Sequence, residues 1–516
     1  MKYDLILKNA NIITVDKDMS RRAWAAVNDG KIVALGKGSA DAPEGKRVLD
    51  LKGRTVLPGL MDCHVHVLLA GLNLSATDLQ GARDVSEVLA LLEAGCKASE
   101  DDWVFGVNYV TQNVKEQRYP TRFELDGISG GKKLMIMAAT LHGCAVNTAA
   151  MEVCAIPGDM PGVEKENGVV TGVYTSDESS FLANANALGD LPEEALWQYI
   201  KDCADNAASK GVTTMHGLFG LLAREDRDMD LILRRGSELP IEMIVFYQTW
   251  DVDKAHAMSL PRVGGCLTLD GASFEYTMAN FTPYKSAPAL RGVLYHNDDE
   301  VYRVVKKAHE YDMQCAMHAL GERAIDQLIY TYHRVIAEQG FKDLRHRIEH
   351  FSYPTEEQIR MAADLKLVLS MQPGFTYYWD RAEGGAFEYM FGRAGADRWD
   401  PFNRVLAAGN IVCAGSDCPV TPVEPLVDIA SVVNGHNPVR NASLDDAIRM
   451  VTINGAYAVK LEAEKGSIEV GKDADFTIID RDPYGCADSK EIYDMKTLCT
   501  IRGGEIIYRA AEFPDA

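Results

Sequence analysis

Apolar runs of strand length alternate with amphipathic helical patterns through the middle of the chain, from about residue 58 to residue 460. One helical pattern opens at Pro192, and the strand-like run 212–216 follows it. Asn297 precedes three acidic residues and a helical pattern through His309, and an Asn cap with an acidic first turn favours a helix start. Strand, helix and strand in succession predict right-handed parallel units, and therefore an α/β fold.

Both ends of the chain show a different pattern, in which short strand-like runs are separated by turns. In residues 1–57, Asp29-Gly30 stands between two such runs, which is a good hairpin signal. Residues 461–516 alternate in a similar way. Two all-β ends around an α/β middle predict one composite β-sandwich built from both chain termini. The alternative is two independent hairpins that lie on the α/β part.

The interval between about residues 70 and 190 holds more sequence than one strand–helix unit needs. We interpret part of it as a cap inserted near the active site, and not as a third independent domain. The predicted organisation is therefore a β-sandwich part at 1–57, an α/β domain with this cap at 58–460, and a second β-sandwich part at 461–516.

The segment with the most chemical information is Asp62-Cys63-His64-Val65-His66, which follows the apolar run 55–61. Side chains two apart on a strand share a face, so His64 and His66 are expected to project together. Two neutral imidazoles on one face suit a borderline metal such as zinc. Taken alone, the pattern also fits two polar residues at the end of a strand.

Three later segments add a further histidine or carboxylate at an expected strand end. His318 and His350 each end such a segment, and Asp417 follows the buried-strand pattern 410–416. A parallel barrel places its functional groups at the C-terminal ends of its strands. Each residue alone fits a structural polar group, but four such segments in series predict a metal centre.

The order His-X-His, His, His and Asp resembles the amidohydrolase superfamily. Other motifs are similar to its YtcJ-like or N-substituted formamide deformylase-like branch (amidohydrolase family 3): 103–109, 120–126, 141–143 with Asn147, 318–321, 346–350, 415–420 and 466–476. The resemblance covers nearly the whole chain and is specific for the superfamily, not for a substrate. It implies a (β/α)8 TIM barrel that holds one or two metal ions at its mouth, together with the terminal β-sandwich.

The expected metal ligands follow from these positions. His64 and His66 are expected to hold one metal, with Asp417 as a further ligand or close neighbour. His318 and His350 are expected to hold a second metal or to complete the coordination of the first. The cofactor is a divalent metal, with zinc favoured by the softness of the ligands; iron, manganese and nickel fit the same ligands.

The expected reaction uses a water molecule bound to the metal, which lowers the pKa of the water so that it loses a proton near neutral pH. Asp417 then takes the proton and gives it to the departing nitrogen. By the resemblance, His142 hydrogen-bonds the substrate carbonyl from the cap; the alternative is a structural role. Arg347 and Glu349 alternate with His350, so we expect them on the other face of the strand, supporting the ligands or packing.

The chain departs from the family pattern at two places. Relatives in this branch commonly carry a lysine four residues before an Asp-Gly; here the Asp-Gly is Asp270-Gly271, and Cys266 stands at the matching position. Cys266 is either a thiolate ligand, which suits zinc, or an ordinary buried cysteine. Ser176 stands where an acidic residue is expected. Both departures favour one metal ion more than in a typical relative.

Three other histidines carry weaker signals. His216 ends a strand-like run and could line the pocket, and His346 lies an even number of residues from His350 and could also face inward. His309 lies in a helical context, which is typical of a surface group.

Composition limits the partners. The net charge of -22 argues against nucleic acid and anionic membranes, both of which need a basic surface. The first residues lack the apolar core of a signal peptide, and no apolar run approaches membrane-spanning length. Eleven cysteines without CxxC spacing suggest reduced thiols in a cytoplasmic protein. We expect a small-molecule substrate and a possible homodimer.

The first functional hypothesis is a metal-dependent hydrolase of a carbon–nitrogen bond in an N-substituted amide, formamide or cyclic amide, with a non-peptide substrate. A heterocycle deaminase with the same metal chemistry is the first alternative. The second is a catalytically silent binding protein that keeps the ligands as relics. The sequence does not name the substrate.

Overall fold

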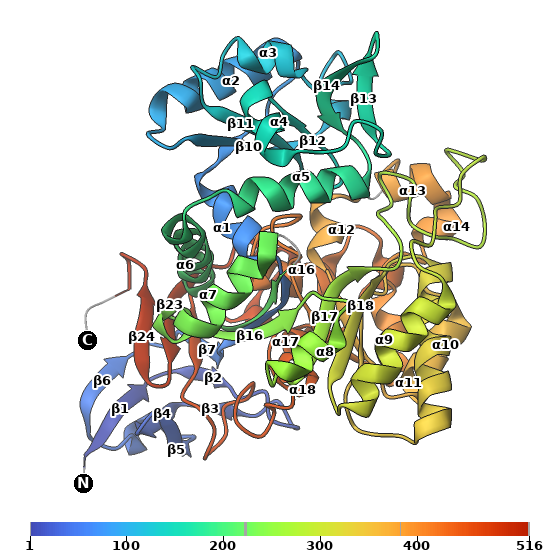
Figure 1. The fold of residues 1–516 in the computed structure, drawn as a ribbon. Helices are drawn as coiled ribbons and strands as arrows, with labels where there is room; N and C mark the ends of the chain where they lie inside the picture. Colours follow the sequence, from blue (N-terminus) through green and yellow to red (C-terminus); the bar gives the residue numbers. More distant parts are fainter. Residues whose placement is uncertain (1, 221–223, 382, 514–516) are drawn as a thin grey trace. The chain divides into compact units, whose positions relative to one another are not determined.

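The computed structural model describes residues 2–220, 224–381 and 383–513, and its largest sheet has eight strands in the order β21-β20-β19-β18-β17-β16-β15-β8. The strands are β8 (Leu60–Val65), β15 (Val212–Phe219), β16 (Glu242–Tyr247), β17 (Arg262–Thr268), β18 (Gln314–Ala319), β19 (Arg347–His350), β20 (Val368–Met371) and β21 (Ile411–Ala414). Val65 forms a parallel bridge with Cys418, and the Asp417 amide donates to the His64 carbonyl at 2.8 Å, so the first and last strands meet. The eight strands form a nearly closed parallel barrel, as predicted (Figure 1).

Helices follow the barrel strands and cover them from outside (Figure 1). They include α8 (Val252–Ala257), α9 (Asp298–Glu310), α10 (Glu322–Gln339), α11 (Glu356–Asp364), α15 (Phe402–Ala407), α16 (Pro425–Asn434), α17 (Leu444–Met450) and α18 (Ile453–Ala458). Asn297 caps α9 in a capping box with Glu300, as its sequence predicts. Val301, Val304 and Val305 bury one face of this helix, because positions three and four apart lie on the same side.

Short helices lie in the segment between β20 and β21, and they are α12 (Gly374–Tyr378), α13 (Ala386–Phe391) and α14 (Arg393–Ala396). Aromatic residues of this segment join a buried cluster with residues that follow β17, β18 and β19; it includes Met278, Leu320, Tyr353, Phe387 and Trp399. The segments after four successive barrel strands therefore pack on one another.

Two further sheets are built from the ends of the chain. One has the order β5-β4-β1-β6, with β1 (Tyr3–Lys8), β4 (Trp24–Asn28), β5 (Lys31–Gly36) and β6 (Gly45–Asp50). The other has the order β24-β23-β22-β7-β2-β3, with β2 (Asn11–Ile13), β3 (Arg21–Arg22), β7 (Thr55–Pro58), β22 (Phe476–Ile479), β23 (Thr497–Arg502) and β24 (Glu505–Arg509). The predicted hairpin is present, since Asp29 and Gly30 join β4 to β5 with φ of 49° and 73°, the left-handed region that tight hairpin turns need.

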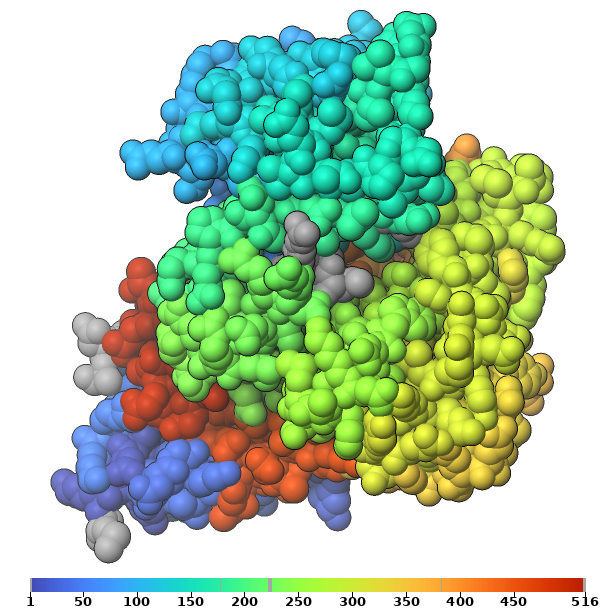
Figure 2. Space-filling view, viewed as in Figure 1, coloured from blue at the N-terminus to red at the C-terminus, as the bar shows by residue number. Residues whose placement is uncertain are grey.

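The two ends of the chain pair with each other. Ile478 in β22 lies opposite Val56 in β7, and Leu5, Val56 and Ile501 belong to one buried cluster. Figure 2 shows the first strands, in blue, beside the last strands, in red. The ends are therefore not two independent hairpins. A composite β-sandwich domain with boundaries at 1–57 and 461–516 stays a proposal.

Residues 66–203, with the described part of 219–236, form a second compact unit. Its sheet has the order β13-β14-β12-β11-β10-β9, with β9 (Thr77–Asp78), β10 (Trp103–Tyr109), β11 (Lys133–Ala138), β12 (Cys144–Val146), β13 (Val163–Glu166) and β14 (Val169–Tyr174). Its helices are α1 (Val67–Ser75), α2 (Val85–Ala98), α3 (Arg122–Asp126), α4 (Thr148–Cys154), α5 (Asp177–Gly189), most of α6 (Glu193–Ser209) and α7 (Arg227–Arg235). Val88, Leu134 and Ala145 belong to a core of its own. The predicted cap falls within this unit, and its role near the active site stays a proposal.

Candidate metal centre

All six predicted ligands belong to three overlapping groups of side chains. The groups are His64, His66 and Cys266; Cys266, His318 and His350; and His64, His350 and Asp417. Within each group, one possible ligand atom per residue lies within 4.8 Å of the others. His64 lies in β8, Cys266 in β17, His318 in β18 and His350 in β19, and Asp417 follows β21. The groups thus gather at the C-terminal ends of the barrel strands.

The backbone at two of these residues has an uncommon conformation. His350 has φ of 72° and Asp417 has φ of 57°, both in the left-handed region. For residues other than glycine this costs about 1–3 kcal/mol and persists where the surroundings impose it, often at functional sites. Both side chains are buried, at 2% and 6% exposure.

His64 is oriented by a carboxylate. Its Nδ1 lies 2.7 Å from Oε2 of Glu349, and both side chains are fully buried. Burial alone would raise the pKa of Glu349, but the charge of Arg347 and the hydrogen bond with His64 lower it to about 2. An ionised carboxylate only accepts hydrogen bonds, so Nδ1 of His64 carries the proton. The Nε2 lone pair of His64 is then the one that can bind a metal, and it lies 3.3 Å from Oδ1 of Asp417.

Arg347 holds this carboxylate in place. It donates to Oε1 of Glu349 at 2.8 Å and to Oε2 at 2.7 Å. It also donates to Nδ1 of His216 and to the carbonyl of Cys63, both at 2.9 Å. Burial and then the charge of Arg347 hold the pKa of His216 well below its usual value, so His216 accepts as a neutral ring. His216 therefore supports Arg347. The expected supporting role of Arg347 and Glu349 is present, but their expected position on the other face of the strand was wrong, because both reach partners on β8 and β15 through the interior of the barrel.

His350 is oriented in the same way by an amide. Its Nδ1 lies 2.8 Å from Oε1 of Gln372, and Nε2 of Gln372 donates to the Ser370 carbonyl at 3.3 Å. The amide oxygen only accepts, so Nδ1 of His350 carries the proton and Nε2 has the lone pair. Burial and then the charge of His318 lower the pKa of His350. His350 is thus a neutral imidazole, the form that binds metals.

Cys266 lies where β17 is irregular. Gly264 and Gly265 have φ of 94° and 109°, and the register with β18 shifts between Gly264 and Thr268. A Cβ on Gly264 would lie 1.9 Å from the carbonyl oxygen of Ala316, so only glycine fits there. Such irregularities re-aim side chains near active sites. Here Sγ of Cys266 lies 3.7 Å from Nδ1 of His318.

Asp270 fixes the other side of the His318 ring. Its Oδ1 lies 3.3 Å from Nε2 of His318. The backbone amides of Ala279, Leu320 and Gly321 donate to the same carboxylate at 2.9, 3.0 and 2.9 Å. Sequence reasoning missed this contact, although Asp270 belongs to the Asp-Gly motif that lies four residues after Cys266.

The donor set fits a bound cation. Burial alone would lower the pKa of His64 and His318, but Asp417 raises that of His64 well above its usual value. Asp270 and Cys266 raise the pKa of His318 to about 10. The groups around both rings therefore favour positive charge. Imidazole, thiol and carboxylate are also the ligands that zinc takes. Two donor atoms that each lie about 2.0–2.1 Å from a tetrahedral ion are about 3.3–3.4 Å apart, and Nε2 of His64 and Oδ1 of Asp417 have this separation.

Sequence reasoning also missed Asp62. Its Oδ1 accepts from the backbone amides of Ser416 at 2.9 Å and His64 at 3.3 Å, and thus joins the first and last barrel strands. Burial raises its pKa to about 6, against the hydrogen bonds from Ser416. A signal was present, because Asp62 alternates with His64 and His66 on one strand face.

Other expectations have mixed outcomes. The surface position of His309 was wrong, because this side chain is fully buried and its Nδ1 lies 3.1 Å from Nε2 of His346. His346 packs on the Tyr332 ring and belongs to none of the ligand groups, so its inward position was also wrong.

His142 lies in the second unit, where its ring packs on Phe181, and its contact with a substrate stays a prediction. Ser176 caps α5.

No helix in the described ranges combines enough length and apolar character to cross a bilayer.

Comparison with known proteins gives a consistent result. Residues 47–508 match the model of the amidohydrolase family. The putative amidohydrolase YtcJ of Bacillus subtilis (strain 168) is 26% identical, over 96% of this chain and 98% of that protein. N-substituted formamide deformylase of Arthrobacter pascens is also 26% identical, over 98% of both chains. Among solved structures, an uncharacterised metal-dependent hydrolase of Pyrococcus horikoshii OT3 has the same fold, with a TM-score of 0.78 and 23% identity over 93% of this chain and 98% of the other.

Proposed function

The chain belongs to the amidohydrolase family and is a metal-dependent hydrolase of carbon–nitrogen bonds other than peptide bonds, and we propose that its substrate is an N-substituted amide, a formamide or a cyclic amide. The observation that carries the metal chemistry is the gathering of His64, His350 and Asp417 within 4.8 Å of one another, and the likeness to N-substituted formamide deformylase supports the substrate class. His64 and His350 lie in β8 and β19, and Asp417 follows β21, so the fold brings together three possible ligands that lie far apart in the sequence.

We further propose that the metal is zinc and that one ion is held. His64, His350 and Asp417, which form one group, are three of the proposed ligands, and His66, which is grouped with His64, completes the set. Cys266 and His318, which are grouped with His350, are further candidate ligands, and Cys266 stands where relatives of this branch commonly carry a lysine. When bound, the metal makes water acidic near neutral pH and polarises a carbonyl group.

The protein residues supply the proton transfer and the orientation of the ligands. Asp417 accepts the proton of the attacking water and returns it to the nitrogen as the carbon–nitrogen bond breaks, giving a carboxylate and an amine. Glu349 and Gln372 hold the rings of His64 and His350 with their Nε2 lone pairs available. His142 is proposed to donate a hydrogen bond to the substrate carbonyl oxygen.

The test is a screen of N-formyl amides, N-acyl amides, cyclic amides and amino-substituted heterocycles with the zinc-loaded protein, in which carboxylate, amine and ammonia are measured. Formation of a carboxylate and an amine, on one ring-opened product in the case of a cyclic amide, supports the proposal, whereas release of ammonia from a heterocycle identifies the deaminase alternative instead. Asp417→Asn should abolish turnover, since an amide cannot accept the proton. Asp364→Asn, an exposed carboxylate at the end of α11, is the matched control and should keep full activity.

A further inference from the structure

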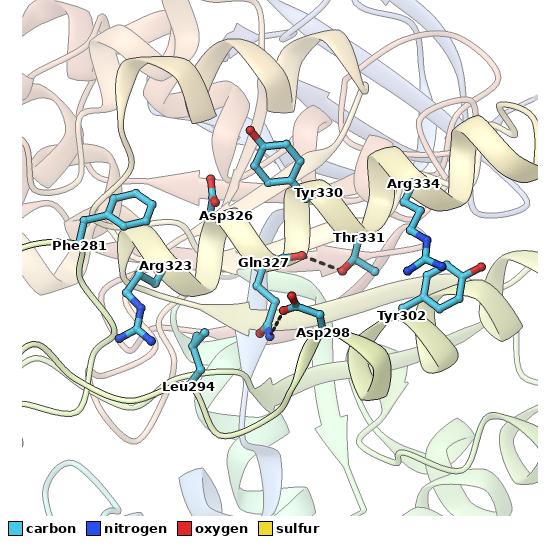
Figure 3. A pocket seen from close by; sticks show the side chains of 10 residues that line it. All are labelled: Phe281, Leu294, Asp298, Tyr302, Arg323, Asp326, Gln327, Tyr330, Thr331 and Arg334. Carbon is cyan, nitrogen blue, oxygen red and sulfur yellow. Dashed lines mark hydrogen bonds between the residues drawn. The ribbon is translucent and has the colours of Figure 1, made fainter.

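A pocket of about 400 Å³ lies between α9, α10 and the loop that precedes α9, and none of its lining residues is a predicted metal ligand (Figure 3). Its size falls in the range of about 300–1,000 Å³ that small-molecule sites occupy. Helix α10 contributes positions 323, 326, 327, 330, 331 and 334, which are spaced so that they share one helix face.

Gln327 carries a buried acceptor in this pocket. Its Nε2 donates to the His296 carbonyl and to Oδ1 of Asp298, both at 2.9 Å. Because both partners only accept, the orientation of the amide is fixed and Oε1 is the remaining polar atom. Gln327 is only 8% exposed, and its Oε1 is buried and has no hydrogen-bond partner in the described part of the chain. A buried acceptor without a donor is unfavourable, so this atom calls for a donor from a bound molecule.

Arg323 supplies a cation on the same side of the pocket as Phe281 (Figure 3). Within the described ranges its guanidinium makes no ion pair or side-chain hydrogen bond. Arg334, the other arginine of the pocket, is already engaged: it donates to Glu338 at 3.0 Å and lies 3.7 Å over the Tyr302 ring. Arg323 is thus the group that can hold a carboxylate with two parallel hydrogen bonds.

The walls of the pocket are aromatic and acidic. Phe281 is 46% exposed and Tyr330 is 49% exposed, which leaves ring surface for a flat apolar group. Asp298 and Asp326 also line the pocket. A ligand with only a carboxylate would meet these two acidic residues, whereas a ligand that also carries an ammonium group balances them.

The pocket is held in shape by the protein itself. The backbone amide of Phe281 donates to Oε2 of Glu322 at 3.1 Å, and that of Arg323 donates to the Ala279 carbonyl at 2.9 Å. The loop and the start of α10 are therefore tied together without a ligand, which reduces the cost of ordering the site on binding.

We propose that this pocket binds a small zwitterion of the aromatic amino-acid type. Its carboxylate contacts Arg323, its ammonium group donates to Oε1 of Gln327 beside Asp298, and its ring packs on Phe281 and Tyr330. This site does not depend on the metal centre or on the proposed substrate.

The test is titration calorimetry of the full-length protein with L-phenylalanine, 3-phenylpropanoate and 2-phenylethylamine. The amino acid is expected to bind, and each analogue, which lacks one of the two charges, to bind about tenfold more weakly or worse. Equal affinity for an analogue, or no heat with the amino acid, overturns the proposal and leaves water as the partner of Gln327.

Variants of residues that line the pocket test whether L-phenylalanine binds there. Arg323→Met should weaken L-phenylalanine binding about tenfold or more, because the charge-assisted hydrogen bonds are lost. Tyr330→Ala should weaken it through the lost ring contact. Arg291→Met, an exposed arginine of the neighbouring loop, is the matched control and should bind as the wild type does. If Arg323→Met binds normally, or if Tyr330→Ala instead changes the oligomeric state in gel filtration, the pocket is not this ligand site.

Discussion

Glu349 and His64 lie 285 positions apart in the sequence, yet their side chains meet at 2.7 Å in the interior of the barrel. The contact fixes which nitrogen of His64 carries the proton, and it is itself held by Arg347. One hydrogen bond therefore links a buried ion pair to a candidate metal ligand.

Glu349→Gln should weaken both the metal site and the fold. The substitution leaves the charge of Arg347 buried without a partner, which costs about 3–5 kcal/mol of unfolding free energy. It also removes the charge that orients His64, and losses of this kind lower metal affinity about 10–100-fold. Urea denaturation and metal content after dialysis measure the two effects. Glu357→Gln, exposed on α11, is the control, and wild-type metal content in Glu349→Gln would contradict the orienting role.

His318→Ala should abolish turnover, with a loss of about 100-fold or more, because a proposed ligand is removed. The fold should persist, so the circular dichroism spectrum is expected to match that of the wild type. His333→Ala, an exposed histidine on α10, serves as the control. Retained activity in His318→Ala would remove this residue from the proposed site.

Cys266→Ser separates the two interpretations of this thiol. A serine hydroxyl is a poorer zinc ligand than a thiolate, so we expect weaker zinc binding in competition with a chromophoric chelator. The neighbouring His318 ring keeps its contact with Asp270, so the fold should be unaffected. Unchanged zinc affinity would make Cys266 an ordinary core cysteine.

Removal of the metal by a chelator should lower the melting temperature, because a ligand that binds only the folded state stabilises it. The expected contribution is about 2.7 kcal/mol at a free metal concentration 100-fold above Kd. Added zinc should restore the melting temperature, and magnesium should not, since it prefers oxygen ligands. Recovery with magnesium, or a melting temperature that chelation leaves unchanged, speaks against a zinc site.

Acid should destabilise the fold through His346. Burial and the nearby charge of His309 lower its folded-state pKa to about 3, whereas the unfolded value is about 6.5. Below about pH 6.5 the unfolded chain binds a proton that the folded chain does not, so stability falls as the pH drops towards about 3. The loss is about 2 kcal/mol between pH 6.5 and pH 5.

This pH effect is tested with His346→Asn, by comparing urea unfolding free energies at pH 6.5 and pH 5. The variant is expected to be less stable at both values, but with a smaller difference between them. His333→Asn is the exposed control and should keep the wild-type difference. A difference as large in His346→Asn as in the wild type places the acid sensitivity elsewhere.

The sequence alone determined several elements and the residues at which they begin, turn or end. The Asp29-Gly30 hairpin, the capped start of α9 and the strand-end histidines all follow from local rules, because turn conformation, capping and the alternation of strand faces depend on neighbours along the chain. The resemblance to a family then placed these strands in a barrel.

Only the tertiary structure decided which side chains lie behind the ligands. Asp270 beside His318, Gln372 beside His350 and Glu349 beside His64 join different strands or loops, and periodicity gives the face of a strand but not its neighbour. His309 was misplaced for the same reason, since burial of a polar ring depends on a distant partner that satisfies it, here His346. Local sequence determines the face of a strand on which a side chain lies, whereas the distances that create a metal site or bury a charge exist only after the chain has folded.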